Sequence, residues 1–289
     1  MKKEASRIET NESTMDSWYT KNFREVRYST FSQSVILQHA EDRQTKQKVA
    51  IKEKMVHDPK IFKLVEKGVE NALKLSKTTK NVLPVQRFEV DISKQVSKLS
   101  FSMPWGDSLH SQFEEERRFS AREVYAIIRG ILEALRAAKD ELGISHNNIK
   151  PTNIIEYDGK YYLSDWESSE LQNGTDPNLF LSSISRDFHY IAPEIRKENK
   201  ISNGFKSDVF SLGLVGLQLC GIKANKIIAM GLSEEKEFMQ RKDIHLQQLA
   251  KSDRRTKTLL TIIDKMLTYD PKLRMDADEL LEYLPMTLE

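Results

Sequence analysis

The hydrophobic pattern of the chain changes near Met103 from a period typical of strands to one typical of helices. Before this point, short β-rich or alternating segments are separated by polar connections, and they predict strands at residues 34–38, 48–54, 85–92 and 96–103. One helical segment, residues 59–75, interrupts them. Strands followed by helices predict an α+β fold with a β-rich first half.

After Met103 the hydrophobic pattern predicts mainly helices. Ser120 and Glu123 have the spacing of a capping box, and the helical period that follows stops at Gly143. Further helices are predicted in a nearly all-apolar run at residues 209–219 and in amphipathic runs at 259–267 and 276–284. We therefore expect a flexible tail at 1–17, an N-terminal lobe at 18–102 and a C-terminal lobe at 103–289, with 18–285 forming one domain.

Charge and hydropathy exclude several classes of function. The 289 residues include 45 Lys and Arg against 43 Asp and Glu, so the net charge gives no argument for nucleic-acid binding. The polar amino end lacks the apolar core of a signal peptide, and no run of about 18 uncharged apolar residues occurs. These features predict an intracellular, cytoplasmic and soluble protein without membrane insertion.

Polar residues cluster where two predicted strands end. A loop from His146 to Asn153 leads into a strand, and Asp158 with Gly159 predicts a hairpin turn before Asp165. The hairpin places Asn153 and Asp165 at neighbouring strand ends. Their amide and carboxylate oxygens are ligands that suit Mg²⁺.

Six motifs occur in order along the chain. They are Val-Ala-Ile-Lys at 49–52, the loop at 146–153, Asp-Trp-Glu at 165–167, Ala-Pro-Glu at 192–194, Ser-Asp-Val-Phe-Ser-Leu-Gly at 207–213 and Asp-Pro with Arg274 at 270–274. Together they give the chain a resemblance to eukaryotic protein kinases from about residue 23 to 284, and their order and spacing make it more specific than any one motif. The resemblance implies a bilobal protein-kinase-like fold, with a mostly helical C-terminal lobe and one main helix in the N-terminal lobe.

The resemblance also implies roles for individual residues. Lys52 would contact the phosphates of ATP, while Asn153 and Asp165 would hold Mg²⁺. Lys150 resembles the lysine that stabilises the transferring phosphoryl group of Ser/Thr kinases. His146 would bond the backbone and not act as a base.

Four further residues are predicted near the nucleotide. The helix partner of Lys52 would be Glu70 in preference to Glu66, because a core-like leucine pattern follows it. Phe101 aligns with the residue that guards the back of the adenine pocket, although an aromatic side chain at this place could equally fill the core. Ser102 and Met103 follow it along the edge of the pocket.

One replacement removes a catalytic group of the family. Asn148 stands where the family has the aspartate that orients the nucleophile, and an amide cannot accept a proton at physiological pH. Loss of a positioned base typically lowers the rate by about 10²- to 10⁴-fold. The sequence therefore predicts impaired phosphoryl transfer.

Other departures affect nucleotide and substrate binding. No glycine precedes Gly68, so side chains occupy residues 28–35, where the family's glycine-rich loop covers the phosphates. Glu167 replaces a glycine next to Asp165, where it would either repel the triphosphate or recruit metal. Residues 186–187 replace a glycine and a threonine where protein substrates would dock.

These features lead to one leading hypothesis and two alternatives. The leading hypothesis is a pseudokinase of Ser/Thr-kinase type that acts as a scaffold or allosteric regulator of a protein partner, such as an active kinase or another enzyme, and retains weak binding of ATP and Mg²⁺. The first alternative is a slow, atypical Ser/Thr kinase that transfers the γ-phosphate of ATP to protein. The second is a small-molecule phosphotransferase of the aminoglycoside and choline kinase type, which the Asp-Trp-Glu triplet favours and the motifs after residue 190 disfavour.

Overall fold

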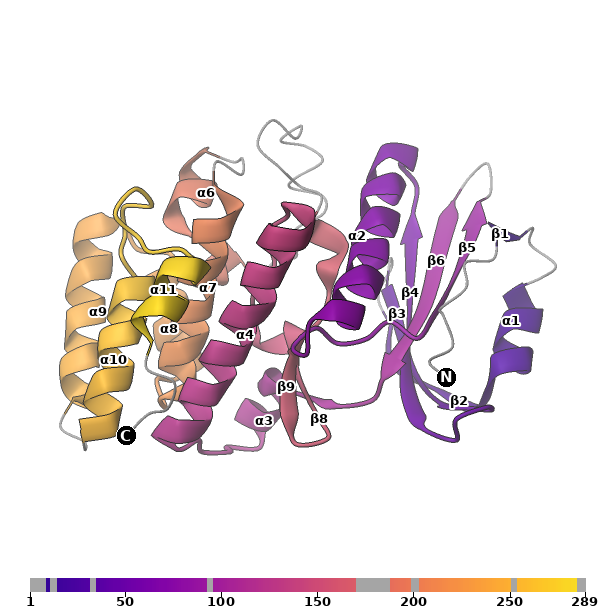
Figure 1. Ribbon diagram of the computed structural model, residues 1–289, viewed down its shortest axis with the longest axis horizontal. Coiled ribbons are helices and arrows are strands. Elements are labelled where there is room, and N and C mark those ends of the chain that lie inside the picture. The colour runs from indigo at the N-terminus through magenta and orange to yellow at the C-terminus, as the bar shows by residue number, and fades with distance from the viewer. Residues whose placement is uncertain are drawn as a thin grey trace.

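The computed structural model describes residues 9–10, 15–31, 35–92, 96–169, 188–198, 203–250 and 254–284. A sheet with two flanking helices forms one lobe, and helices form most of the other (Figure 1). The α+β bilobal architecture predicted from the sequence is confirmed. The change from strand to helix falls just after the strand that ends at Pro104.

The first lobe is built on a six-stranded sheet of order β1-β5-β6-β4-β3-β2. Strands β2 to β6 pair antiparallel, and β1 pairs parallel with β5 at one edge. The strands are β1 (Glu9–Thr10), β2 (Phe23–Phe31), β3 (Val35–Asp42), β4 (Lys48–Val56), β5 (Arg87–Ile92) and β6 (Ser97–Pro104).

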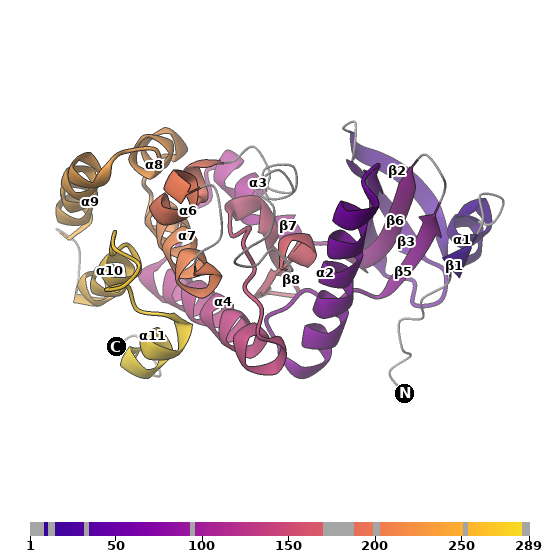
Figure 2. The same ribbon diagram turned by 90° about the horizontal axis from the view of Figure 1, so that it is seen from above.

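The two faces of this sheet are covered by different helices. Helix α2 (Pro59–Thr78) lies on the side of the second lobe, and helix α1 (Met15–Asn22) lies on the opposite side (Figures 1 and 2). Trp18 of α1 packs on Val49 and Ile51 in a small separate core. Because side chains alternate along a strand, Lys52 and its neighbours of the same parity point toward the second lobe.

The expected tail at residues 1–17 falls mostly outside the described residues. Within it, β1 forms at Glu9–Thr10 and α1 begins at Met15. Helix α1 continues to Asn22, and the Trp18 side chain is only 4% exposed. The amino-terminal segment therefore contributes both β1 and α1 to the first lobe.

Local capping signals set the ends of the main helices. Asp58 caps α2 by accepting the backbone N–H of Lys60 at 2.7 Å. The predicted capping box of Ser120 and Glu123 begins α4 (Ala121–Leu142), and Gly143 ends it with a φ of 67°. A left-handed φ of this kind is readily adopted by glycine.

Helices of the second lobe pack around α7, whose residues are nearly all buried, as its apolar sequence predicts. Helix α4 runs alongside α7 in both views (Figures 1 and 2). The helices of this lobe are α3 (Leu109–Glu114), α4, α6 (Pro193–Glu198), α7 (Gly204–Leu219), α8 (Ala224–Gly231), α9 (Glu235–Leu249), α10 (Arg254–Met266) and α11 (Ala277–Tyr283).

A buried ion pair joins α6 to the segment that precedes α11. Arg274 has no exposed surface, and its two terminal nitrogens lie 2.7 and 3.1 Å from the two carboxylate oxygens of Glu194. Ser207 donates to Glu194 at 2.8 Å, and Arg274 also donates to the carbonyls of Thr268 and Tyr269. The ion pair thus connects two of the six motifs, Ala-Pro-Glu at 192–194 and Asp-Pro with Arg274.

The predicted hairpin is present as β8 (Ile154–Tyr157) and β9 (Lys160–Leu163). Asp158 and Gly159 have φ values of 50° and 68°, as the tight turn between the strands requires. The short strand β7 (Asp107–Ser108) pairs with β8 in the same small sheet. The hairpin begins just after Asn153 and ends just before Asp165.

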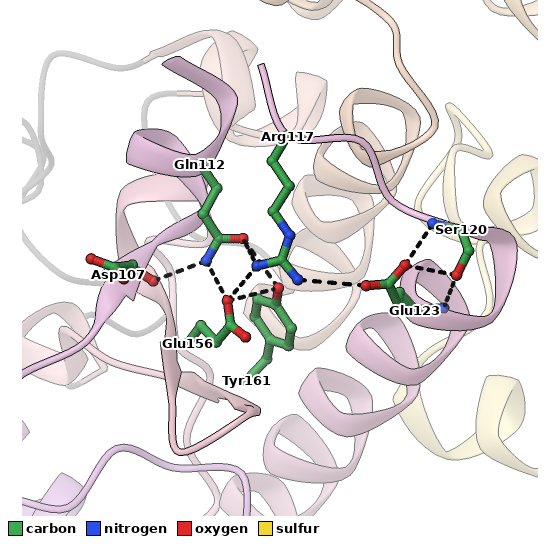
Figure 3. A network of polar contacts seen from close by, with 7 residues as sticks. All are labelled: Asp107, Gln112, Arg117, Ser120, Glu123, Glu156 and Tyr161. Carbon is green, nitrogen blue, oxygen red and sulfur yellow. Dashed lines mark hydrogen bonds and ion pairs between the residues drawn. The ribbon is translucent and has the colours of Figure 1, made fainter. Parts of the chain in front are cut away.

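A polar network connects the hairpin to α3 and to the start of α4 (Figure 3). Glu156 of β8 accepts bonds from Arg117 at 2.5 Å and from Gln112 at 2.8 Å, and Arg117 also pairs with Glu123 at 3.5 Å. Burial raises the pKa of Tyr161 to about 12, so its hydroxyl stays protonated 3.1 Å from the Gln112 oxygen. The network ties the strand that follows Asn153 to α3 and α4.

Candidate active site

Lys52 lies where the two lobes meet. It projects from β4 and forms ion pairs with Asp165 and with Glu167, whose Oε1 lies 2.7 Å from Lys52 Nζ. The ammonium also lies 5.9 Å from the centre of the Phe101 ring. The structure thus brings the predicted phosphate-binding lysine to the predicted metal ligand Asp165.

Asp165 is held from both sides of the cleft. Asn148 Nδ2 donates to Asp165 Oδ2 at 3.0 Å, while Lys52 donates to Oδ1. Burial alone would raise the pKa of Asp165, but the charges of Lys52 and Lys54 outweigh it and keep the pKa well below its usual value. Asp165 is therefore a carboxylate, although both its oxygens already accept a bond from the protein.

Asn153 is positioned through its backbone and its amide nitrogen. Its N–H donates to Lys150 O at 3.0 Å, its carbonyl accepts from the N–H of Ser164 at 2.9 Å, and its Nδ2 donates to Asn148 O at 2.8 Å. The amide group is therefore oriented with Oδ1 as its ligand atom, which also accepts a bond from Thr152 Oγ1 at 3.3 Å. Lys150 is 9% exposed and comes from the same loop.

Asn153 and Asp165 suit a divalent cation in the chemistry of their oxygens. Each Asp165 oxygen already accepts one bond, from Lys52 or from Asn148, and keeps a second lone pair that a magnesium ion could use. Within the described ranges, no group of three or more His, Cys, Asp or Glu side chains is arranged to hold a metal ion. Phosphate oxygens of a nucleotide would have to complete the shell.

His146 anchors the loop and is not a base. Its Nδ1 accepts the backbone N–H of Asn148 at 3.2 Å, so the proton resides on Nε2, which donates to Ser164 O at 2.9 Å. The ring is fully buried, and burial lowers its pKa to about 4. The backbone N–H groups of His146 and Asn147 donate to Asp208 at 2.6 and 2.8 Å, which ties this loop to α7.

The neutral state of His146 makes stability depend on pH. Its pKa is about 4 in the folded chain and 6.5 in the unfolded chain. Between these two pH values the unfolded chain therefore binds a proton at His146 that the folded chain does not bind. The stabilisation is complete above pH 6.5 and falls as the pH drops toward 4, by about 3 kcal/mol in all. In urea unfolding between about pH 7 and pH 5, this loss should disappear in His146→Gln, and an unchanged loss in that variant would contradict the assignment.

The three residues predicted at the back of the pocket lie on two different faces of β6. Phe101 and Met103 line a small cavity together with Val69 of α2 and Glu167. Phe101 stands opposite Lys52, and the two are paired in the register of β4 and β6. Ser102 alternates to the other face of the sheet, where it has no exposed surface.

Glu70, the predicted helix partner of Lys52, has its ion pair with Lys67 on the same helix, at 3.5 Å. Its side chain is 26% exposed. The two ion pairs of Lys52 instead come from the segment that follows β9. Of the predicted loop at residues 28–35, residues 28–31 end β2 and residue 35 begins β3, while residues 32–34 lie outside the described part of the chain. The docking residues 186–187 also lie outside it.

Lys54 belongs to the cleft but was not predicted from the sequence. It follows Lys52 by two residues on β4, so it shares its face, and burial lowers its pKa to about 8, with the charge of Lys52 adding to the effect. The period of two was visible in the sequence and could have indicated it. The cleft therefore presents Lys52, Lys54 and Lys150 around Asp165 and Glu167.

Comparison with known proteins agrees with this geometry. A model of the protein kinase domain matches residues 32–284. The match covers most of the chain, which therefore belongs to the protein kinase superfamily. None of the helices in the described residues is long and apolar enough to cross a membrane.

Proteins similar to this chain include Ser/Thr kinases at low identity. Serine/threonine-protein kinase H1 of Mus musculus is 23% identical over 265 residues, which cover 88% of this chain and 58% of that protein. A calcium and calcium/calmodulin-dependent serine/threonine-protein kinase of Lotus japonicus is 25% identical over 182 residues, which cover 62% of this chain and 34% of that protein. The chain thus spans less than two thirds of the length of either relative.

Proposed function

We propose that this chain is a protein-kinase-like domain with impaired phosphoryl transfer, which acts by binding a protein partner as a scaffold or allosteric regulator. The observation that carries the proposal is the hydrogen bond from Asn148 Nδ2 to Asp165 Oδ2 at 3.0 Å. In this arrangement the side chain at position 148 is a donor directed at the predicted metal ligand. A catalytic base at this place would have to accept a proton from the substrate hydroxyl.

Weak binding of nucleotide with Mg²⁺ is part of the proposal. The three lysines of the cleft, Lys52, Lys54 and Lys150, supply positive charge for phosphates, and Asn153 and Asp165 supply oxygens for the metal. Against binding, Lys52 already has two carboxylate partners and no glycine occurs before Gly68. ATP must therefore compete with protein groups for the same ammonium.

A thermal-shift titration with ATP tests this binding. We expect millimolar ATP to raise the melting temperature in the presence of Mg²⁺, with a smaller rise in EDTA, because a ligand of the native state stabilises it. Lys52→Met should abolish the rise, and Lys98→Met on the other side of the same lobe should leave it intact. If the wild-type chain shows no shift, the domain acts without nucleotide.

The alternative of a slow Ser/Thr kinase is favoured by the convergence of Lys52, Lys150, Asn153 and Asp165 in one cleft and by the names of the similar proteins. Transfer of radiolabelled γ-phosphate to a generic protein substrate distinguishes the two. Activity that both Lys52→Met and Asp165→Asn abolish would overturn the pseudokinase proposal. Transfer that neither variant changes would come from a contaminating kinase.

A further inference from the structure

Glu167 is the most enclosed carboxylate at the cleft. Its side chain is 2% exposed, and its Oε1 lies 2.7 Å from Lys52 Nζ. Its Oε2 is buried without a hydrogen-bond partner among the residues that the structure describes. A buried carboxylate that lacks a cation is strongly unfavourable, so Lys52 and Glu167 stabilise each other at this position.

The packing of α2 explains why this carboxylate comes from the segment after β9. Gly68 of α2 faces the short helix η3 (Trp166–Ser168), and a Cβ at Gly68 would lie 2.3 Å from Trp166 O and 2.6 Å from Glu167 Cα. The helix therefore touches the backbone of η3 directly, with no room for a side chain between them. This close approach leaves Glu167 next to β4.

Helix α2 does offer carboxylates, but the predicted candidate, Glu70, forms an ion pair within its own helix. Glu70 pairs with Lys67 on its own helix and is 26% exposed, whereas Glu167 is almost completely enclosed. Solvent screens enclosed ion pairs much less than exposed ones. The enclosed pair with Glu167 therefore strongly constrains the position of Lys52. The position of Lys52 is thus coupled to the segment that also carries Asp165.

We propose that Glu167 is the positioning residue for Lys52. It takes the role that the resemblance to kinases assigns to a glutamate of α2. Two consequences follow. The lysine keeps its orientation without an ion pair to α2, so a shift of that helix would not release it. Glu167 also competes with phosphate for Lys52, because both are anions that bind the same ammonium. The second consequence rests on the proposed nucleotide site, and the first does not.

The first test measures Lys52 itself, without nucleotide. The chain is treated with an uncharged acetylating reagent, and the rate of modification of Lys52 is followed by peptide mass spectrometry, with Lys98 as an internal reference. We expect Glu167→Gln to raise the rate at Lys52 on the order of fivefold, as the loss of one partly enclosed ion pair implies. The matched control Glu70→Gln should leave the rate unchanged.

A second variant guards against misfolding of Glu167→Gln. Gly68→Ala changes no charge but forces η3 away from α2, so it should also raise the rate at Lys52, with circular dichroism confirming the fold. If Glu70→Gln accelerates modification of Lys52 while Glu167→Gln and Gly68→Ala do not, the assignment of Glu167 is wrong. A purely structural role of Glu167 would change melting temperature without changing the reactivity of Lys52 in the folded chain.

The second test separates this inference from the proposed function. ATP without Mg²⁺ is titrated against the acetylation of Lys52, and we expect about fivefold lower ATP concentrations to protect Lys52 in Glu167→Gln than in the wild type. Weaker or equal protection in the variant would overturn the competition. If ATP gives no protection to any variant, the nucleotide site fails, while the first test still decides whether Glu167 positions Lys52.

Discussion

Asn148→Asp is expected to raise the rate of γ-phosphate transfer to a protein substrate by about 10²- to 10⁴-fold over the wild type. The substitution places a carboxylate where the loop holds the side chain next to Asp165, within reach of a substrate hydroxyl. Lys150 comes from the same loop, and the resemblance to kinases predicts that it stabilises the transferring group. Radiolabelled ATP with a mixed Ser and Thr peptide substrate measures the rate.

The same substitution should weaken the cleft when no cation is present. It replaces a hydrogen bond of 3.0 Å between Asn148 and Asp165 by two carboxylates in contact, and like charges at this distance raise the pKa of one of them and destabilise the fold. We expect a lower melting temperature in EDTA that Mg²⁺ restores. Asn148→Leu, which adds neither a base nor a charge, is the matched control and should gain no activity.

If Asn148→Asp does not raise the transfer rate, a step other than proton acceptance limits the reaction. If Asn148→Asp binds ATP with Mg²⁺ but transfers no faster than Asn148→Leu, then the base is not what limits the wild-type chain. Substrate placement by residues 186–187 or the loop without glycine would then be limiting. Such a result would contradict the central position that the proposed function gives to Asn148.

Features that depend on neighbouring residues were predicted well from the sequence. The capping box at Ser120 and the hairpin turn at Asp158 and Gly159 form as expected, and the helix predicted in the run at 276–284 begins with a capping box at Asp276. Each needs only groups within about one turn of chain, so its energy is set by local sequence. The end of α2 was less accurate, since the helix continues to Thr78, three residues past its expected end at 75.

Two elements of the first lobe carried too weak a local signal. Strand β2 is largely exposed over its described side chains and contains a bulge near Glu25, which interrupts the alternation that predicts a strand. Helix α1 has a mixed polar sequence, and its formation depends on Trp18 and Tyr19 packing against the sheet. Tertiary contacts of this kind outweigh local propensity and leave little trace in the pattern.

At the site, too, features carried by sequence motifs were predicted, and features that depend on tertiary packing were not. The order of the motifs placed Lys52 and Asp165 in one cleft, and the structure joins them across 113 residues of sequence. The pairing of Lys52 with Glu167 could not be predicted, because it depends on how closely α2 approaches η3. That distance is set by the missing side chain of Gly68, whose role appears only when the two segments are packed together.

Arg274→Met is expected to lower the free energy of unfolding by about 3–5 kcal/mol, the largest stability effect that we predict. The guanidinium has no exposed surface and donates to both oxygens of Glu194, to Thr268 O and to Tyr269 O. Methionine fills a similar volume but leaves Glu194 as a buried charge without a cation. Urea unfolding followed by circular dichroism measures the difference.

The matched control is the exposed pair of Arg241 and Glu237 on α9, at 2.6 Å. Arg241→Met should cost at most about 0.5 kcal/mol, because an exposed pair on one helix is screened by water. The double variant Arg274→Met with Glu194→Met should recover part of the loss, since it removes the unpaired charge along with its partner. Recovery stays incomplete because the carbonyls of Lys206, Thr268 and Tyr269 lose the donor that Arg274 supplies. If Arg274→Met costs no more than Arg241→Met, the buried pair does not hold α6 to the segment that precedes α11.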